Sequence, residues 1–197
     1  MATVNQPAAM NYTVPELEAL GIHVGDNPGI HRSVLFFNPE KIVIGHHVRI
    51  DCLSVLSAGE EGISIGRNVH IASSCLVFGS GGRVVFSDFS GLSARVTLFT
   101  ASDDYAEGYL TNPTVPERYK KISRGSIVLD RHVIVGASSV ILPGVTLARG
   151  CAVGAMSLVH RDVGEYEVAF GIPIRVVGRR DSKRLQELET AYLESEG

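Results

Sequence analysis

Long apolar runs are nearly absent from this chain, which also has few cysteines and no excess of basic residues. Its 197 residues include 21 glycines, a composition that favours neither a helix bundle nor a membrane-spanning helix. The net charge of −3 excludes an obvious nucleic-acid-binding surface. The first residues lack the basic start and apolar core of a secretory signal. We therefore expect one cytoplasmic domain with no membrane span and no nucleic-acid partner.

The three cysteines, Cys52, Cys75 and Cys151, are widely separated and show no CxxC spacing. A disulfide framework in a secreted domain needs more cysteines at closer spacing. We interpret them as free thiols in a reducing compartment, and most simply as small buried side chains.

What the sequence does have is a six-residue rhythm of aliphatic or Phe residues, which we call marker residues. Neither a helix nor a hairpin repeats every six residues over such a length, whereas a coil of three short strands does. The markers form six triplets: Val24, Ile30, Phe36; Ile44, Ile50, Leu56; Ile65, Ile71, Val77; Phe86, Leu92, Leu98; Leu129, Val135, Ile141; and Leu147, Val153, Val159. We predict an all-β chain that forms a parallel β-helix of about six coils.

The corners of this coil are not equivalent. The residue after most markers is Gly, Ala, Ser or Asp, but five of the six exceptions follow the third marker of a triplet. Every insertion also falls after a third marker, and the largest spans about 103–126. Extra residues should therefore leave the coil at one corner, and the largest insertion should form a protruding loop.

The ends of such a stack need caps. We assign 1–21 to an N-terminal cap, in which VPELEAL (14–20) makes a short helix, and 22–180 to the β-helix. The remaining 181–197 should form a C-terminal helix, because Asp181 or Ser182 can cap its start. Its apolar stripe of Leu185, Leu188, Ala191 and Tyr192 indicates packing or trimer contact.

The segment IVLDRHVIVGASSVILPGVTLARGCAVGAMSLVHRDV, followed by AFGIPIRVVGRR, closely resembles the hexapeptide-repeat acyltransferases. The resemblance covers roughly 42–180. Within the family, the chain is most similar to galactoside and maltose O-acetyltransferases and to sugar N-acyltransferases of surface-polysaccharide pathways. This resemblance implies a left-handed β-helix, a homotrimer, acetyl-CoA as acyl donor and a sugar or nucleotide-sugar acceptor. It implies no metal.

The resemblance also implies roles for individual residues. Small residues at the corners should line the pantetheine arm of CoA, a pair near its adenosine should replace the usual Thr-Lys, and arginines should bind its phosphates. The small corner residues are Gly136, Ala137 and Ala155. The pair in place of Thr-Lys is His160 and Arg161, and the phosphate-binding arginines are Arg175, Arg179 and Arg180.

One departure from the family concerns the general base. The galactoside-type enzymes place a histidine just after the strand that corresponds to SARVTLFT, where this chain has Asp103 followed by Asp104. Three accounts remain open. The acceptor is an amine attracted to the aspartates, Asp103 is itself a base with a raised pKa, or a histidine elsewhere (His70, His132 or His160) serves.

The insertion DDYAEGYLTNPTVPERYKKIS lies beside this position and is too long for a passive turn. Its Tyr105 and Tyr109, with Arg95 just before it, are candidates for acceptor binding, although an arm that stabilises a trimer explains the insertion nearly as well.

Two other classes of function stay open: a noncatalytic β-helix scaffold, and a γ-type zinc carbonic anhydrase, for which the seven histidines lack metal-ligand spacing.

Overall fold

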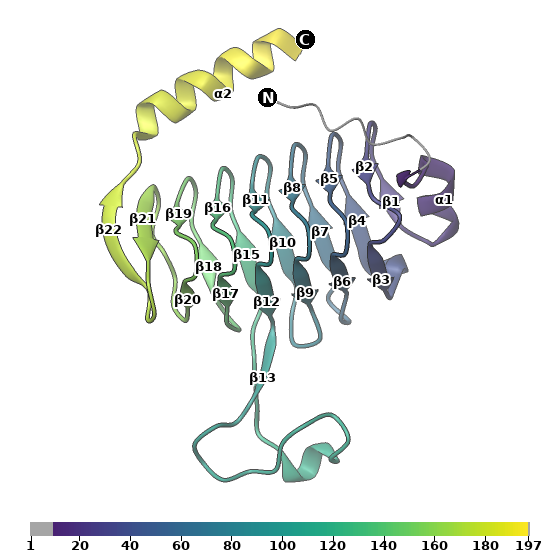
Figure 1. Cartoon of the computed structure of the whole chain (residues 1–197), viewed down its shortest axis with the longest axis vertical. Coiled ribbons are helices and arrows are strands. Elements are labelled where there is room, and N and C mark those ends of the chain that lie inside the picture. The colour runs from purple at the N-terminus through teal and green to yellow at the C-terminus, as the bar shows by residue number, and fades with distance from the viewer. Residues whose placement is uncertain (1–9, 197) are drawn as a thin grey trace.

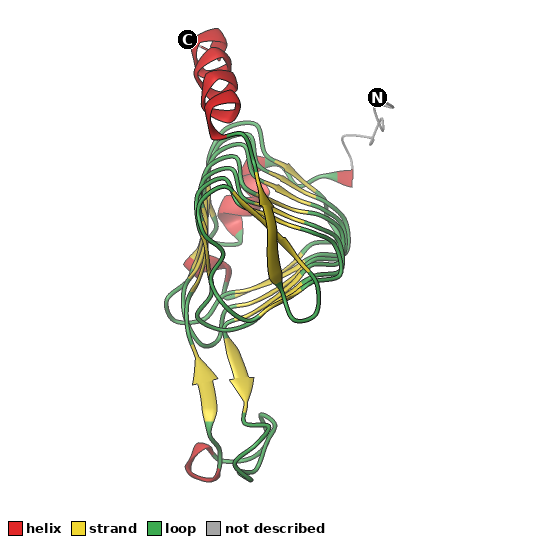
Figure 2. Ribbon diagram, turned by 90° about the vertical axis from the view of Figure 1, so that its left-hand side faces the viewer, coloured by secondary structure: helices red, strands yellow, loops and turns green. Residues whose placement is uncertain are grey.

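The computed structural model, which describes residues 10–196, is a triangular prism of parallel strands. An arm extends from one corner of the prism, and a helix lies on the opposite side (Figures 1 and 2). The predicted parallel β-helix, with its protruding loop and C-terminal helix, is confirmed. The predicted number of about six coils was too low, because a seventh coil follows the six marker triplets.

The prism has three sheets, one for each side of the triangle. The first sheet contains β1 (His23–Val24), β4 (Ile42–Ile44), β7 (Ile63–Ile65), β10 (Val84–Phe86), β15 (Ile127–Leu129) and β18 (Thr146–Leu147). The second contains β2 (Gly29–Ile30), β5 (Arg49–Ile50), β8 (His70–Ile71), β11 (Gly91–Leu92), β16 (Ile134–Val135), β19 (Ala152–Val153), β21 (Glu167–Phe170) and β22 (Arg175–Arg179). The third contains β3 (Leu35–Phe37), β6 (Val55–Ser57), β9 (Leu76–Phe78), β12 (Thr97–Phe99), β17 (Val140–Ile141) and β20 (Leu158–Val159).

The seventh coil has no marker triplet because Val163 comes only four residues after Val159 and the chain reverses before a third marker. Val163 bridges Leu147 of the first sheet, and β21 pairs in parallel with β19. The chain then reverses, so that β22 pairs antiparallel with β21 and ends the stack. A reversed edge strand blocks the addition of a further coil.

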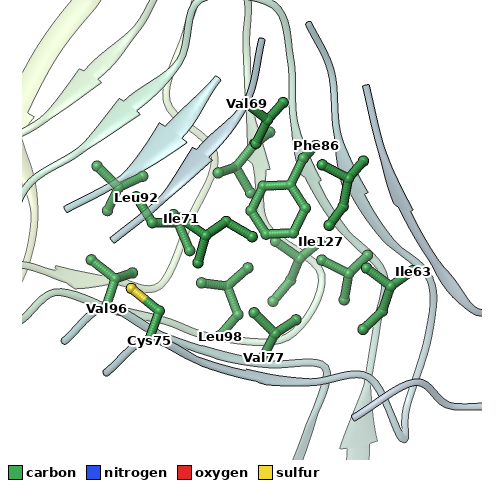
Figure 3. Packing of buried hydrophobic residues seen from close by; sticks show 14 of the residues in the cluster. Ile63, Val69, Ile71, Cys75, Val77, Phe86, Leu92, Val96, Leu98 and Ile127 are labelled. Atoms are coloured by element: carbon green, nitrogen blue, oxygen red, sulfur yellow. The ribbon is translucent and has the colours of Figure 1, made fainter. Parts of the chain in front are cut away.

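The core of the prism combines the marker residues with apolar residues two positions before them, such as Ile63, Val69 and Val96 (Figure 3). The markers of the second to sixth coils are at most 3% exposed, whereas Val24 and Phe36 at the open end are partly buried. Strand register aligns equivalent markers, so that Ile44, Ile65 and Phe86 lie one above another along the first sheet. Each coil therefore covers the apolar side chains of its neighbours, which is how a solenoid stabilises itself.

The corners use a left-handed backbone conformation, and this aligns their side chains. The third residue after a marker has positive φ in most coils, as at His47, Asn68, Phe89 and His132 of the first corner, between the first and second sheets. The second corner, between the second and third sheets, does the same at Leu53, Ser74, Arg95, Ser138 and Met156. Non-glycine residues rarely adopt this conformation, so repeated use of it indicates that the corner requires it.

The third corner, between the third sheet and the first, releases the insertions as predicted. The largest becomes an arm in which β13 (Ala101–Asp103) pairs antiparallel with β14 (Ile122–Arg124). A short 3-10 helix, Glu117–Tyr119, lies near the tip of the arm, and another, Pro39–Lys41, fills an earlier insertion at the same corner. The arm begins at Ala101, two residues before the predicted start, and ends at Arg124, two residues before the predicted end.

Of the two helices that flank the prism, only the first covers an end of it. Helix α1 (Val14–Ala19) begins with a capping box between Thr13 and Glu16 and buries Leu17 completely. Helix α2 (Ser182–Glu196) begins at Asp181, whose carboxylate accepts a hydrogen bond from the Arg184 backbone at 2.9 Å. Figure 1 shows α2 running along the row of first corners rather than across the end of the prism.

Candidate functional site

A groove of about 490 Å³ crosses the outer face of the second sheet at the third to fifth coils. Its floor is formed by β8, β11 and β16, on which Gly91 has no side chain and leaves open space above the sheet. One wall is the first corner, with Phe89, His132 and Arg180; the other is the second corner, with Ser93 and Ala94. Such a concave surface with a few polar groups is a typical small-molecule site.

His132, a predicted catalytic residue, is held in a cluster beneath α2. Its ring stacks on Phe89 with centroids 5.0 Å apart, and its Nε2 lies 2.9 Å from the Glu189 carboxylate. Glu189 also pairs with Arg131 and Arg149, and both His132 and Glu189 have side chains only 10% exposed. Burial favours the neutral form of Glu189, but its hydrogen bond and attraction to His132 and Arg131 outweigh burial and lower its pKa.

A second groove of about 360 Å³ lies between α2 and the prism. Leu185, Leu188 and Tyr192 of the predicted apolar stripe line it from the helix, whereas Ala191 does not, and Leu188 is 50% exposed. Tyr192 meets Phe89 edge-on and its hydroxyl accepts a hydrogen bond from Asn68 at 3.0 Å. The helix thus ties together the first corners of several coils.

His70 lies on the floor of the 490 Å³ groove and is oriented by a carboxylate. Its Nε2 is 2.9 Å from Oδ2 of Asp51 in the preceding coil, and Arg49 donates to Oδ1 of the same carboxylate at 2.7 Å. Burial favours the neutral form of Asp51, but these hydrogen bonds from His70 and Arg49 outweigh burial and lower its pKa. Asp51 is therefore ionised at neutral pH.

Asp103 and Asp104 stand where the arm leaves its two-stranded stem. Oδ2 of Asp103 accepts the Asn112 backbone N–H at 3.0 Å, and the side chain lines a hollow of about 250 Å³ with Lys120 and Arg124. Asp104 turns inward on its own loop and accepts the backbone N–H groups of Ala106 and Glu107.

These contacts give the two aspartate carboxylates different surroundings. Desolvation favours the neutral form of Asp104, but hydrogen bonds from the backbone of Glu107 and Ala106 outweigh it and lower its pKa. A carboxylate held in this way shapes the loop and is a weaker base than usual. Asp103 is the member of the pair that faces a hollow.

The predicted acceptor-binding residues are exposed in the single chain. Tyr105 is 94% exposed and Tyr109 is 47% exposed, both on the arm. Arg95 lies at the second corner of the fourth coil, where its Nε donates to Ser138 at 3.2 Å. Within one chain, Arg95 and the tyrosines are thus at different corners and do not form one site.

The predicted CoA-binding residues fall into three groups. Gly136, Ala137 and Ala155 lie together at the second corner of the fifth and sixth coils, where Ala137 accepts the Met156 backbone N–H at 2.8 Å. His160 and Arg161 are exposed at the third corner, directly after β20. The three arginines belong to the last coil and the segment that leads to α2.

The arginines differ in how free their side chains are. The Arg175 guanidinium is exposed and makes no hydrogen bond or ion pair with residues 10–196. Arg179 donates to the Glu165 carbonyl at 2.9 Å. Arg180 donates to the carbonyls of His132 and Gly150, both at 2.9 Å, so it stabilises two first corners and its charge lines the groove.

Sequence reasoning missed Ser93, Asp51 and the cluster around Glu189. Ser93 follows a marker, where small residues are expected for packing alone, so nothing in the pattern marks it as functional. Asp51 and His70 are 19 residues apart, a separation that only the length of a coil explains.

Two further structural findings concern residues 10–196. All three cysteines are free, with Cys75 and Cys151 buried. The described part of the chain contains no helix long and apolar enough to cross a membrane, and no group of three His, Cys, Asp or Glu side chains placed to hold a metal ion.

Comparison with known proteins identifies relatives along almost the whole chain, although no family model matches. The dTDP-4-amino-4,6-dideoxy-D-glucose acyltransferase of Escherichia coli is 39% identical over 178 residues, which are 90% of this chain and 92% of that protein. The galactoside O-acetyltransferase of Lactococcus lactis is 27% identical over 124 residues, 56% of this chain and 53% of that protein.

Among solved structures, the N-acyltransferase AntD of Bacillus cereus in complex with dTDP and 3-hydroxybutyryl-CoA superposes with a TM-score of 0.88. It is 35% identical, and the match covers 94% of this chain and 97% of that one. Other solved forms of AntD carry substitutions of one serine or of one aspartate ten positions further along. With its seven coils, its groove and these relatives, the chain belongs to the hexapeptide-repeat acyltransferase family.

Proposed function

We propose that the protein transfers an acyl group from CoA to the amino group of a dTDP-linked amino sugar. The 39% identity to an acyltransferase of dTDP-4-amino-4,6-dideoxyglucose is the observation that supports this most strongly. AntD, which binds the same amino sugar nucleotide together with CoA, matches over a similar length. An aspartate where O-acetyltransferases have a histidine also suits an amine better than a hydroxyl.

The chemistry explains that preference. A sugar hydroxyl is a poor nucleophile until a base removes its proton, whereas a neutral amine attacks a thioester directly. Most of the amine is protonated in water, so a carboxylate that attracts the ammonium concentrates the acceptor at the thioester. The bound ammonium first releases one proton to water, and the neutral amine nitrogen then bonds to the thioester carbon. As the C–S bond breaks, a second proton passes from nitrogen to the CoA sulfur.

Asp103 is the carboxylate that we assign to the amine. Its spacing from Ser93 is ten residues, the same as that between the serine and the aspartate substituted in AntD. Ser93 lines the groove of the second sheet, and its hydroxyl can orient the thioester or the acceptor there. Asp104, which is committed to its own loop, has no role in catalysis in this account.

Within one chain, Ser93 directly follows β11 and Asp103 ends β13, so β12 and two corners separate them. The arm then takes Asp103 away from the prism (Figure 2). We propose that the active site forms between chains of a homotrimer, where the Asp103 arm of one chain meets the groove of the next. Tyr105 and Tyr109 of the arm then have a partner surface to contact.

The donor in this account is acetyl-CoA. The small residues Gly136, Ala137 and Ala155 lie together at one corner, where the pantetheine arm can approach the backbone, and the unpaired Arg175 is available for a CoA phosphate. We place the reaction in the cytoplasm, in the synthesis of sugars for surface polysaccharides.

Substitution and mixing of chains test this function. With dTDP-4-amino-4,6-dideoxyglucose and acetyl-CoA, Asp103→Asn and Ser93→Ala should each reduce CoA thiol release by about 100-fold. The exposed Asp26 of the first coil provides a control, since Asp26→Asn should release thiol like the unaltered protein.

Refolding the two inactive variants together should restore part of the activity, because a mixed trimer contains interfaces with one intact Ser93 and one intact Asp103. Full activity of Asp103→Asn would contradict its assignment. Mixtures no more active than either variant would contradict the shared site.

A further inference from the structure

The groove contains a histidine–aspartate pair to which the proposed function has given no role. His70 projects from β8 with a side chain 51% exposed, whereas the Asp51 side chain beneath it is only 17% exposed. The carboxylate is fixed from two directions, by His70 at 2.9 Å and by Arg49 at 2.7 Å. A partly buried carboxylate that accepts two hydrogen bonds and orients an exposed imidazole is the arrangement of a proton-transfer pair.

The pairing determines which ring nitrogen is free. Asp51 is ionised and only accepts hydrogen bonds, so Nε2 of His70 must be the protonated nitrogen that donates to it. In the neutral ring, the unshared electron pair is then on Nδ1. This nitrogen bonds to no group in residues 10–196, and the ring lines the groove. The pair therefore presents a proton acceptor to whatever occupies the groove.

The surroundings of His70 suit a reacting centre. The next coil has Gly91 beside it in the sheet, which leaves the space above the imidazole open. Ser93, which lines the same groove, is two residues further along that strand and corner. His70 on the floor and Ser93 on the wall thus line the same groove, which in the proposed trimer the arm of a neighbouring chain completes.

We propose that His70, oriented by Asp51, accepts the proton that the attacking amine must lose. This inference rests on the proposed function. As the nitrogen–carbon bond forms, a proton moves from the amine nitrogen to Nδ1 of His70. As the carbon–sulfur bond breaks, the same proton returns from Nδ1 to the sulfur of CoA, so the pair ends the cycle unchanged. Asp103 binds the amine, and His70 moves its proton.

Glutamine at position 70 keeps a donor for Asp51 but has no basic nitrogen. His70→Gln should lower kcat by about 100-fold or more, with KM for both substrates within about threefold of the original. Asp51→Asn should lower kcat by about tenfold or more, because the imidazole loses its fixed tautomer. His47→Asn is the matched control, an exposed corner histidine outside the groove, and should leave kcat unchanged.

The pH profile separates proton transfer from a structural role. The charged or titratable groups around the groove are Asp51, Arg49, His132 and Arg180. If His70 is the acceptor, kcat of the original protein and kcat of His70→Gln should depend on pH differently, because only the original protein has a basic nitrogen at this position. Calorimetry with CoA should give the same affinity for both proteins.

The outcomes distinguish this inference from the proposed function. No transfer to the amino sugar by the unaltered protein overturns both. An active His70→Gln beside an inactive Asp103→Asn overturns only the role of His70. Weaker CoA binding with unchanged kcat in His70→Gln makes His70 a binding residue and also overturns the inference.

Discussion

At the scale of single residues, Gly136 is fixed by contact between neighbouring coils. A Cβ atom at this position would lie 2.4 Å from the backbone nitrogen of Ala155, far inside van der Waals contact. The coils cannot separate locally without loss of strand pairing between β16 and β19. The small residue that follows a marker is therefore required by packing, whatever further role it has toward CoA.

Gly136→Ala should consequently reduce the free energy of unfolding by about 1–3 kcal/mol, the usual cost of overpacking. Gly178 is the matched control, because nothing lies within 4 Å of a Cβ placed there. Gly178→Ala should change stability by less than about 0.5 kcal/mol. Urea denaturation followed by circular dichroism measures both, and equal stabilities would contradict the close approach of the coils.

The cysteines provide a second test at this scale. Burial raises the pKa of the Cys75 thiol to about 11 and that of Cys151 to about 12. Since the thiolate is the reactive form, neither should react with a thiol reagent at pH 8 while the protein is folded. We expect one reactive thiol, Cys52, in native protein and three after denaturation. Rapid reaction of all three in native protein would show that the core opens.

At the scale of elements, α2 is attached to the prism mainly through Glu189 and Tyr192. The ordinary pKa of a glutamate is 4.5, and that of Glu189 is lowered in the folded protein. A lowered pKa means that Glu189 stabilises the docked helix above about pH 4.5, and that this contribution is lost as the pH falls through the lower folded value.

Glu189→Gln should therefore weaken helix docking at neutral pH by about 1–3 kcal/mol, since Arg131 and His132 lose a charged partner. Hydrogen exchange of the α2 amides measures docking, and the variant should exchange faster at pH 7 with less change on acidification. Glu187→Gln is a control on the same helix, because Glu187 pairs only with helix residues Lys183 and Arg184. Equal exchange in the two variants would contradict the role of Glu189.

The elements differ in how far the sequence predicts them. The coils follow from a local rule, one inward side chain every six residues, so the triplets from Ile44 to Val159 identify the second to sixth coils directly. The seventh coil follows a shortened step of four residues from Val159 to Val163 and is closed by a reversed strand, so the strict repeat does not extend to it. The start of α2 was predictable from Asp181, because helix capping is also local.

The site was less predictable, because it depends on which corners meet. Asp103 could be identified from the sequence because it occupies the position of the catalytic histidine in the galactoside-type enzymes. The His70–Asp51 pair depends on the exact length of one coil, and the burial of His132 depends on where α2 docks. Ser93 is indistinguishable in sequence from any other small corner residue.

At the scale of the whole molecule, the prism presents its groove and its arm on different sides. The groove lies on the second sheet, beside α2, while the arm extends from the third corner on the side opposite α2 (Figure 2). A single chain therefore separates Ser93 and His70 from Asp103. In the homotrimer that we propose, the arm of one chain meets the groove of the next, which gives the long arm and its exposed tyrosines a contact surface.

The central claim is that the acceptor atom is an amine nitrogen on a nucleotide sugar. The most direct measurement is CoA thiol release with acetyl-CoA and either dTDP-4-amino-4,6-dideoxyglucose or the matched sugar nucleotide with a hydroxyl in place of the amine. The account predicts release with the amine alone and a product that has gained one acetyl group as an amide. Equal release with both acceptors, or release with the hydroxyl alone, would contradict it.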